Sequence, residues 1–275
     1  MVAPHSVFLI DSTFIFKRII ETFHETPLLI NKNGQDQTRL YGFLRDLLRL
    51  YVTLNISYGV VVIGKEVTSI APREDIDSVV EMINLMNIPL LLQLDQDILN
   101  ICTTISHQFT HLVCDNKGLL QLTNDNIKII MPSKQESYIE ISSQDIFFNL
   151  GVKPNEIPTF LALSGSSGKR KASIDLTERQ TIKLIKSYGN LESIFRNFSE
   201  IKNNAIRNKL DLNKKIIFSR YSKLQKNKTK SLFSFIVDNC KWALSNDNSK
   251  KILQSNGFFS LQPLLELPKG KKVEQ

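Results

Sequence analysis

Two carboxylates and one glycine directly follow short apolar runs in the first half of the chain. Asp11, Gly64 and Asp115 each stand immediately after such a run. If the runs are parallel strands of an α/β sheet, the groups beyond their carboxyl ends gather at one edge, where such proteins hold ligands and carry out reactions. We therefore expect the site chemistry of this half of the chain to lie at these three positions.

Basic side chains cluster in the second half of the chain. Three of them are consecutive and three more follow at helical spacing, and they are Lys169, Arg170, Lys171, Arg179, Lys183 and Lys186. Clusters of lysine and arginine contact phosphates, and such contacts do not depend on base sequence. The alternative interpretation is an exposed, solvated basic loop that has no ligand.

The net charge of +8 is divided unevenly along the chain. Residues 1–164 hold 12 Lys and Arg against 18 Asp and Glu, whereas residues 165–275 hold 23 against 9. A basic C-terminal part is the electrostatic signature of a partner that carries phosphates, so we expect nucleic-acid binding there. A solubilising composition rich in lysine and asparagine is the alternative.

Apolar patterns predict the elements that would position the acidic residues. The runs at residues 6–10, 59–63, 88–92 and 111–114 are each long enough for a strand buried on both faces. Apolar residues at spacings of three and four predict helices over residues 38–55, 75–86 and 95–106. This alternation predicts an α/β fold with a mostly parallel sheet flanked by helices.

The strand signals fade from about residue 143. Helices are predicted beyond this point over residues 143–150, 154–163, 176–188, 191–198 and 212–224, with breaks at glycines and polar residues. The sequence therefore predicts an α/β domain over residues 1–142 and a helical portion over residues 143–275.

Several other kinds of site are excluded by spacing. Cys102, Cys114 and Cys240 are far apart and form no Cys-x-x-Cys pair, so we interpret them as buried small apolar residues. The four histidines show no metal-binding spacing. The apolar run near the start is only four residues long, so we expect no signal peptide, no membrane span and a cytoplasmic protein.

Taken in order, several segments resemble the 5′–3′ exonuclease family, which includes the nuclease domain of bacterial DNA polymerase I and the flap endonucleases. The segments are Phe8-Leu9-Ile10-Asp11-Ser12, Tyr41-Gly42-Phe43-Leu44, Leu119-Leu120-Gln121-Leu122, Ala162-Leu163-Ser164-Gly165 and Ser187-Tyr188-Gly189-Asn190-Leu191-Glu192. Their order and spacing extend over nearly the whole chain. The resemblance implies a PIN/resolvase-like α/β fold followed by an all-helical helix–three-turn–helix portion.

In that family, carboxylates at the edge of the sheet bind two divalent cations, Mg²⁺ or Mn²⁺, which cleave a phosphodiester. The resemblance matches two of these carboxylates, Asp11 and Asp97. Either Asp95 or Asp115 could join them if its side chain turns inward. The alternative is structural, with Asp11 as a helix N-cap and Asp97 as an acid in the first turn of a helix.

Most other acidic positions of the family are filled by different residues here. The second family aspartate falls on Gly64, with Glu66 as a displaced substitute. A family Asp-Lys-Asp falls on Asn116-Lys117-Gly118, which leaves Asp115 one residue out of register, and a late aspartate falls on Ser166. The remaining carboxylates are too few to neutralise two divalent ions.

Two further departures concern DNA. The long basic arch that gates single-stranded DNA in the family is missing between residues 64 and 94. The glycine-rich hairpin that contacts duplex phosphates is replaced by the basic segment 168–175.

These observations favour a DNA-binding 5′–3′ exonuclease-like protein that is catalytically impaired, a pseudoenzyme, and binds duplex or branched DNA through backbone phosphates. Two alternatives remain open. One is an active metal-dependent 5′–3′ exonuclease or flap endonuclease that uses Mg²⁺ or Mn²⁺. The other is a scaffold protein that binds no nucleic acid.

Overall fold

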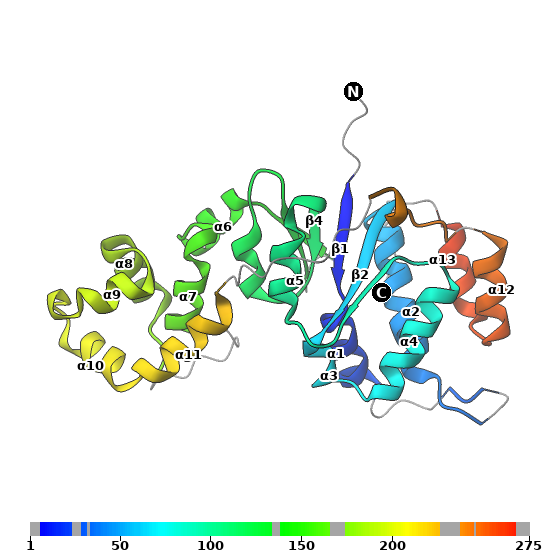
Figure 1. Cartoon of the computed structure of the whole chain (residues 1–275), viewed down its shortest axis with the longest axis horizontal. Helices are drawn as coiled ribbons and strands as arrows, with labels where there is room; N and C mark the ends of the chain where they lie inside the picture. The colour runs from blue at the N-terminus through cyan, green and yellow to red at the C-terminus, as the bar shows by residue number, and fades with distance from the viewer. Residues whose placement is uncertain are drawn as a thin grey trace. The chain divides into compact units, whose positions relative to one another are not determined.

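The computed structural model describes residues 6–23, 29–31, 34–133, 138–165, 174–225, 237–244 and 246–267. These residues form two compact units (Figure 1). Unit 1 takes the described residues within 1–115, 130–139 and 229–275, and unit 2 takes those within 116–129 and 140–228.

A six-stranded sheet forms the centre of the fold, in the order β3-β2-β1-β4-β5-β6. Its strands are β1 (Val7–Asp11), β2 (Tyr58–Gly64), β3 (Leu90–Gln93), β4 (His111–Val113), β5 (Lys128–Pro132) and β6 (Tyr138–Ile141). Strand β1 pairs in parallel with both β2 and β4, and β2 pairs in parallel with β3. The carboxyl ends of these four strands therefore lie at one edge of the sheet.

Helices bury the strands of unit 1 (Figure 1). They are α1 (Thr13–Thr22), α2 (Thr38–Thr53), α3 (Lys65–Thr68), α4 (Arg73–Leu85), α5 (Ile98–Thr104), α12 (Asp247–Ser255) and α13 (Gln262–Glu266), with short 3₁₀ turns η1 (Ser106–Gln108), η5 (Val237–Cys240) and η6 (Phe259–Leu261). Strands β1 and β2 are buried over most of their length because apolar side chains cover both of their faces.

The C-terminal segment packs against the sheet of unit 1. The indole N–H of Trp242 donates to the carbonyl of Gly59 at 2.8 Å, and its ring stacks on Tyr51 with centroids 5.7 Å apart. The sequence predicted a single boundary after residue 142, with all later residues in one helical portion. By their contacts, the described residues after 229 group with unit 1.

Unit 2 is almost entirely helical. It contains η2 (Lys117–Leu122), α6 (Ser143–Leu150), η3 (Pro154–Glu156), α7 (Ile157–Ser164), α8 (Glu178–Tyr188), α9 (Leu191–Arg196), η4 (Phe198–Glu200), α10 (Asn204–Leu212) and α11 (Lys214–Leu224). Helix α7 packs on α8 and α11, and their apolar side chains form a core of their own, which includes Leu163, Leu184 and Ile217.

The predicted fold class, α/β with a helical portion, is confirmed. All three cysteines are buried, as interpreted from their spacing. Within the described residues, no helix combines the length and the apolar character that crossing a membrane requires.

Candidate functional site

The sheet brings the predicted acidic residues to one edge. Asp11 ends β1, Gly64 ends β2, and Asp115 lies two residues beyond β4. Asp95 and Asp97 lie between β3 and α5. Because β1 to β4 run parallel, all five positions follow carboxyl ends of the same sheet.

Asp11 is the most enclosed of these carboxylates, with 1% of its surface exposed. Its Oδ1 accepts a hydrogen bond from the Thr13 N–H at 2.9 Å, whereas Oδ2 is buried without a hydrogen-bond partner among the described residues. Burial, with smaller contributions from the nearby carboxylates of Asp115 and Glu66, raises the pKa of this carboxyl to about 7. The contact with Thr13, the first residue of α1, gives Asp11 a structural role at the helix start.

Glu66 lies beside Gly64, and its carboxylate accepts a hydrogen bond from the backbone. Its Oε1 and Oε2 accept from the N–H of Ile98 at 3.0 and 3.1 Å. A Cβ added at Gly64 would lie 3.0 Å from Oε2, so the glutamate carboxylate fills the space next to the glycine. Burial raises the pKa of Glu66, and the charge of Asp97 adds to this effect.

Glu66, and not Asp97, bonds the start of α5. Asp97 was predicted either as a metal ligand or as an acid in the first turn of a helix. Asp97 holds the N-cap position of α5, but its side chain makes no capping hydrogen bond. The N–H of Ile98, the first residue of the helix, donates its hydrogen bond to Glu66 instead. Asp97 and Asp95 are both exposed.

Asp115 is paired with a cation of the chain itself. The ammonium of Lys17, on α1, lies 3.2 Å from Oδ2 and 3.4 Å from Oδ1. Both side chains are partly exposed, so the pair is worth little in stability, but it places a positive charge at the acidic edge.

These residues do not fit a two-metal centre. Such a centre needs a cluster of oxygen ligands around each ion. In the described part of the chain, no three or more His, Cys, Asp or Glu side chains are arranged to hold a metal ion. The unpartnered Oδ2 of Asp11 could serve as one ligand, but Glu66 is bonded to Ile98 and Asp115 to Lys17. The sheet therefore gathers Asp11, Asp95, Asp97 and Asp115 at its edge without assembling them into a metal site.

The predicted basic residues divide between described and undescribed segments. Arg179, Lys183 and Lys186 lie on α8, and all three are exposed. Lys169, Arg170 and Lys171 lie outside the described residues. The opposite side of α8 is buried through Thr181, Leu184 and Ile185, which turns the three cations toward solvent.

A buried ion pair, which sequence reasoning missed, fixes the chain just before α8. Oδ1 of Asp175 lies 2.6 Å from a guanidinium nitrogen of Arg220 on α11, and its carbonyl accepts from the Lys209 ammonium at 3.2 Å. Gly165 permits this packing, because a Cβ there would lie 2.7 Å from Oδ2 of Asp175.

Two curated proteins are similar to the chain in sequence, although no protein-family model matches it. The chain is 25% identical over 240 residues to a 5′–3′ exonuclease of Aquifex aeolicus (strain VF5), which covers 77% of this chain and 81% of that protein. It is 30% identical over 125 residues to a 5′–3′ exonuclease of Buchnera aphidicola subsp. Acyrthosiphon pisum (strain APS), which covers 45% of this chain and 40% of that protein.

Solved structures share the fold at lower sequence identity. The catalytic core of Rad2 in complex with a DNA substrate superimposes with a TM-score of 0.61 at 14% identity, over 95% of this chain and 91% of that one. The T5 D15 protein co-crystallised with metal ions superimposes with a TM-score of 0.56 at 11% identity, over 95% and 96%. At such identities the likeness shows the fold alone.

Proposed function

Because the chain belongs to the 5′–3′ exonuclease and flap endonuclease family, we propose that it has kept the DNA-binding role of such a protein and lost metal-dependent cleavage. The proposed substrate is duplex or branched DNA, held through backbone phosphates by the basic face of unit 2. This face consists of Arg179, Lys183 and Lys186 of α8. Lys169, Arg170 and Lys171, which lie outside the described residues, are proposed as further phosphate contacts.

The observation that carries the loss of cleavage is the occupation of the acidic edge by the chain's own groups. Gly64 supplies no carboxylate, Glu66 is bonded to a helix N-terminus, and Lys17 neutralises Asp115. Two-metal cleavage would need enough carboxylates to hold two cations, which together would stabilise the attacking and leaving oxygens of the phosphodiester. Among the described residues, no three His, Cys, Asp or Glu side chains are arranged around one ion. Two ions at this edge would therefore have too few ligands.

The exposed cations of α8 support DNA binding. They project from a helix whose N-terminus is fixed by a capping box between Thr177 and Gln180, so they stand on a rigid element. The Rad2 core, which shares this fold, was solved with a DNA substrate. Phosphate contacts of this kind bind without reading base sequence.

An active metal-dependent nuclease is the second candidate. The buried, unpartnered Oδ2 of Asp11 favours it, because a divalent cation would satisfy this oxygen. Asp97 is exposed at the same edge of the sheet and could supply a second ligand.

Incubation with a 5′-labelled flap substrate in Mg²⁺ and in Mn²⁺ tests the two candidates, with cleavage and gel retardation scored on the same samples. We expect retardation without cleavage. Cleavage that disappears in Asp11→Ala would establish the second candidate, and a protein that neither cleaves nor retards the substrate would refute both.

A further inference from the structure

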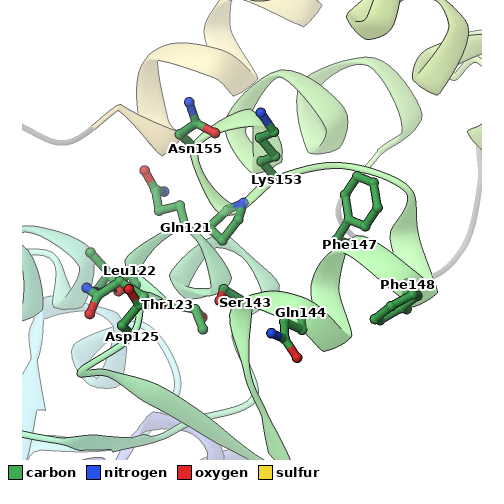
Figure 2. Close-up of a pocket in the computed structure, with 12 residues that line it drawn as sticks. Gln121, Leu122, Thr123, Asp125, Ser143, Gln144, Phe147, Phe148, Lys153 and Asn155 are labelled. Carbon is green, nitrogen blue, oxygen red and sulfur yellow. Dashed lines mark hydrogen bonds between the residues drawn. The ribbon is translucent and has the colours of Figure 1, made fainter.

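An open groove with a volume of about 830 Å³ lies within unit 2 (Figure 2). It is bounded by the end of η2 and the turn that follows, by α6 and by the segment that leads into η3. Its lining residues are Gln121, Leu122, Thr123, Asn124, Asp125, Ser143, Gln144, Phe147, Phe148, Lys153, Pro154 and Asn155.

Two exposed phenylalanines form one wall of the groove. Phe148 is 80% exposed and Phe147 is 49% exposed, and their rings meet edge to face with centroids 6.2 Å apart. They are not part of the core of unit 2, because Ile146 is the buried residue of α6. Leaving two adjacent phenyl rings in water is unfavourable, and such surfaces often bind a ligand.

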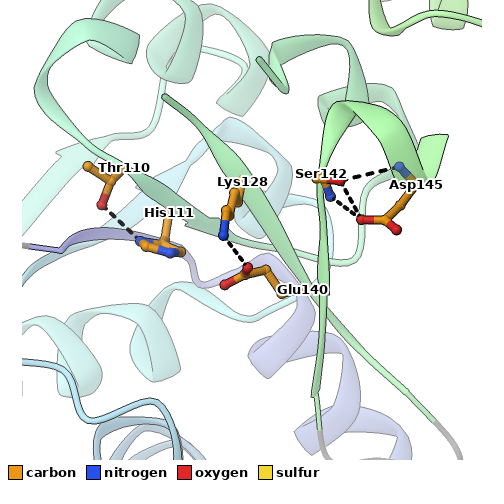
Figure 3. A network of polar contacts seen from close by, with 6 residues as sticks. All are labelled: Thr110, His111, Lys128, Glu140, Ser142 and Asp145. Atoms are coloured by element: carbon orange, nitrogen blue, oxygen red, sulfur yellow. Dashed lines mark hydrogen bonds and ion pairs between the residues drawn. The ribbon is translucent and has the colours of Figure 1, made fainter. Parts of the chain in front are cut away.

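The wall is held rigidly. A capping box between Ser142 and Asp145 fixes the start of α6, and the ammonium of Lys128 lies 2.6 Å from Glu140 just before it (Figure 3). Gly151 ends the helix in the left-handed conformation with φ of +70°. The two rings are therefore presented by an element that is fixed at both ends.

Apart from Leu122 and Pro154, the rest of the lining is polar, and some of its hydrogen-bonding capacity is unused. Gln144 and Asn155 are exposed amides without a hydrogen-bond partner among the described residues. Thr123 is 4% exposed, and its buried hydroxyl also lacks a partner there. An amide offers one acceptor and two donors, the combination found on the edges of nucleobases.

We propose that this groove binds an unpaired nucleobase from a single-stranded segment of nucleic acid. The base stacks on Phe148, the more exposed of the two rings, and is hydrogen-bonded by the amides. Stacking on exposed aromatic rings is how proteins hold single strands of any sequence. The groove offers a peptide little in comparison, because apart from the two rings its exposed lining is polar and carries one acid, Asp125, and one base, Lys153.

The groove adjoins the helix that carries the proposed phosphate contacts. A Cβ at Gly151, at the end of α6, would lie 3.3 Å from Cδ1 of Ile182 on α8. Ile182 stands between Arg179 and Lys183 in the sequence. Residues 116–129 and 140–228 together hold 19 Lys and Arg against 9 Asp and Glu, so unit 2 attracts a polyanion as a whole. The inference rests on the proposed function for its phosphate contacts, which lie on α8. The base itself would be held by the phenylalanines of α6.

Fluorescence polarisation with a short labelled oligothymidylate, an oligouridylate and a blunt DNA duplex tests the site. We expect Phe148→Ala to weaken single-strand binding about tenfold and to leave duplex binding unchanged. Phe148→Leu keeps an apolar side chain without a π face, so it should also weaken binding, while Phe148→Trp should preserve it. Phe259→Ala removes another exposed phenylalanine, in unit 1, and serves as the matched control.

A second measurement reads the contact directly. The natural tryptophan, Trp242, is buried, so Phe148→Trp adds an exposed indole whose fluorescence a stacked base quenches. We expect quenching by the oligothymidylate in this variant and none in Phe259→Trp. If the parent protein does not bind the duplex, the proposed function is refuted. The groove could still bind the single strand in that case, and the oligothymidylate would still quench the indole of Phe148→Trp. Unchanged single-strand affinity in both Phe148→Ala and Phe148→Leu, or equal quenching in the two tryptophan variants, would overturn the groove proposal.

Discussion

The ammonium of Lys17 lies 3.2 Å from the carboxylate of Asp115, at the edge of the sheet where Asp11 and Gly64 also end their strands. A fixed cation of the chain thus stands against one of the few carboxylates left at this edge. Together with the missing side chain at position 64, this pair lowers the negative charge at the edge.

Restoring charge at the edge should restore metal binding. In Lys17→Met with Gly64→Asp, Asp115 is released and a carboxylate is added, although Glu66 must shift because its Oε2 lies 3.0 Å from the new Cβ position. We expect isothermal titration calorimetry to detect Mn²⁺ binding in this variant and none in the parent. Lys17→Met with Gly64→Ala is the control, which should remain silent. Equal Mn²⁺ binding by the parent would contradict this account of the edge.

The titration of Asp11 should make stability depend on pH. Burial raises the pKa of this carboxyl from its ordinary value of 3.8 to about 7 in the fold, so the folded protein holds the proton more tightly than the unfolded chain. The free energy of unfolding contributed by this group is therefore greatest below about pH 4 and is lost as the pH rises toward 7, by up to about 4 kcal/mol.

Urea unfolding of the parent and of Asp11→Asn, at about pH 5 and about pH 8, measures this contribution. Other groups titrate as well, so the relevant quantity is the difference between the two proteins at each pH. We expect the parent to lose stability relative to Asp11→Asn as the pH rises. A difference that stays constant across this range would show that Asp11 keeps one protonation state.

The ion pair between Asp175 and Arg220 should be important for the stability of unit 2. Asp175 is almost fully buried, so Arg220→Met leaves a carboxylate with less compensation in the interior, which we expect to cost about 3 kcal/mol in urea unfolding. Arg73→Met is the matched control, since its pair with Asp77 is exposed and should contribute less than about 1 kcal/mol. Equal effects of the two substitutions would mean that the buried pair has no special role.

Strands with continuous apolar runs were predictable because a strand buried on both faces needs apolar side chains at consecutive positions. The runs at 59–63 and 6–10 became β2 and β1 with shifts of one residue at their ends. Strands β5 and β6 were not predicted, since both are short and mix polar with apolar residues, as Lys128 and Glu140 illustrate. No range was predicted for helix α1, although the alternative of Asp11 as a helix N-cap implies a helix at this point.

The partners of the acidic residues could not be predicted from spacing. Glu66 and Ile98 are 32 positions apart, and Lys17 and Asp115 are 98 apart. Strand order brings the four residues to one edge, but the direction of each side chain depends on local packing that no periodic pattern encodes. The residue types at the edge were therefore predictable, whereas their engagement by the chain itself was not.

The salt dependence of DNA binding should identify the phosphate contacts on α8. Each phosphate contact releases counterions from DNA and contributes about 0.9 to the slope of log affinity against log salt. If Arg179, Lys183 and Lys186 each contact one phosphate, changing all three to Ala should reduce the slope by up to about 3 as well as lowering affinity. Fluorescence polarisation of a duplex over a series of KCl concentrations measures both quantities.

Two further variants complete this experiment. The first variant changes Lys169, Arg170 and Lys171 together to Ala. Because the segment is expected to contact phosphates, this change should also lower the affinity and the slope, and we expect it to leave thermal unfolding unaltered. A triple change of Arg73, Lys250 and Lys251, which lie in unit 1, removes the same charge elsewhere and controls for net charge. A slope that falls equally in the control and in the α8 variant would place the contacts outside α8, since only long-range charge would then be acting.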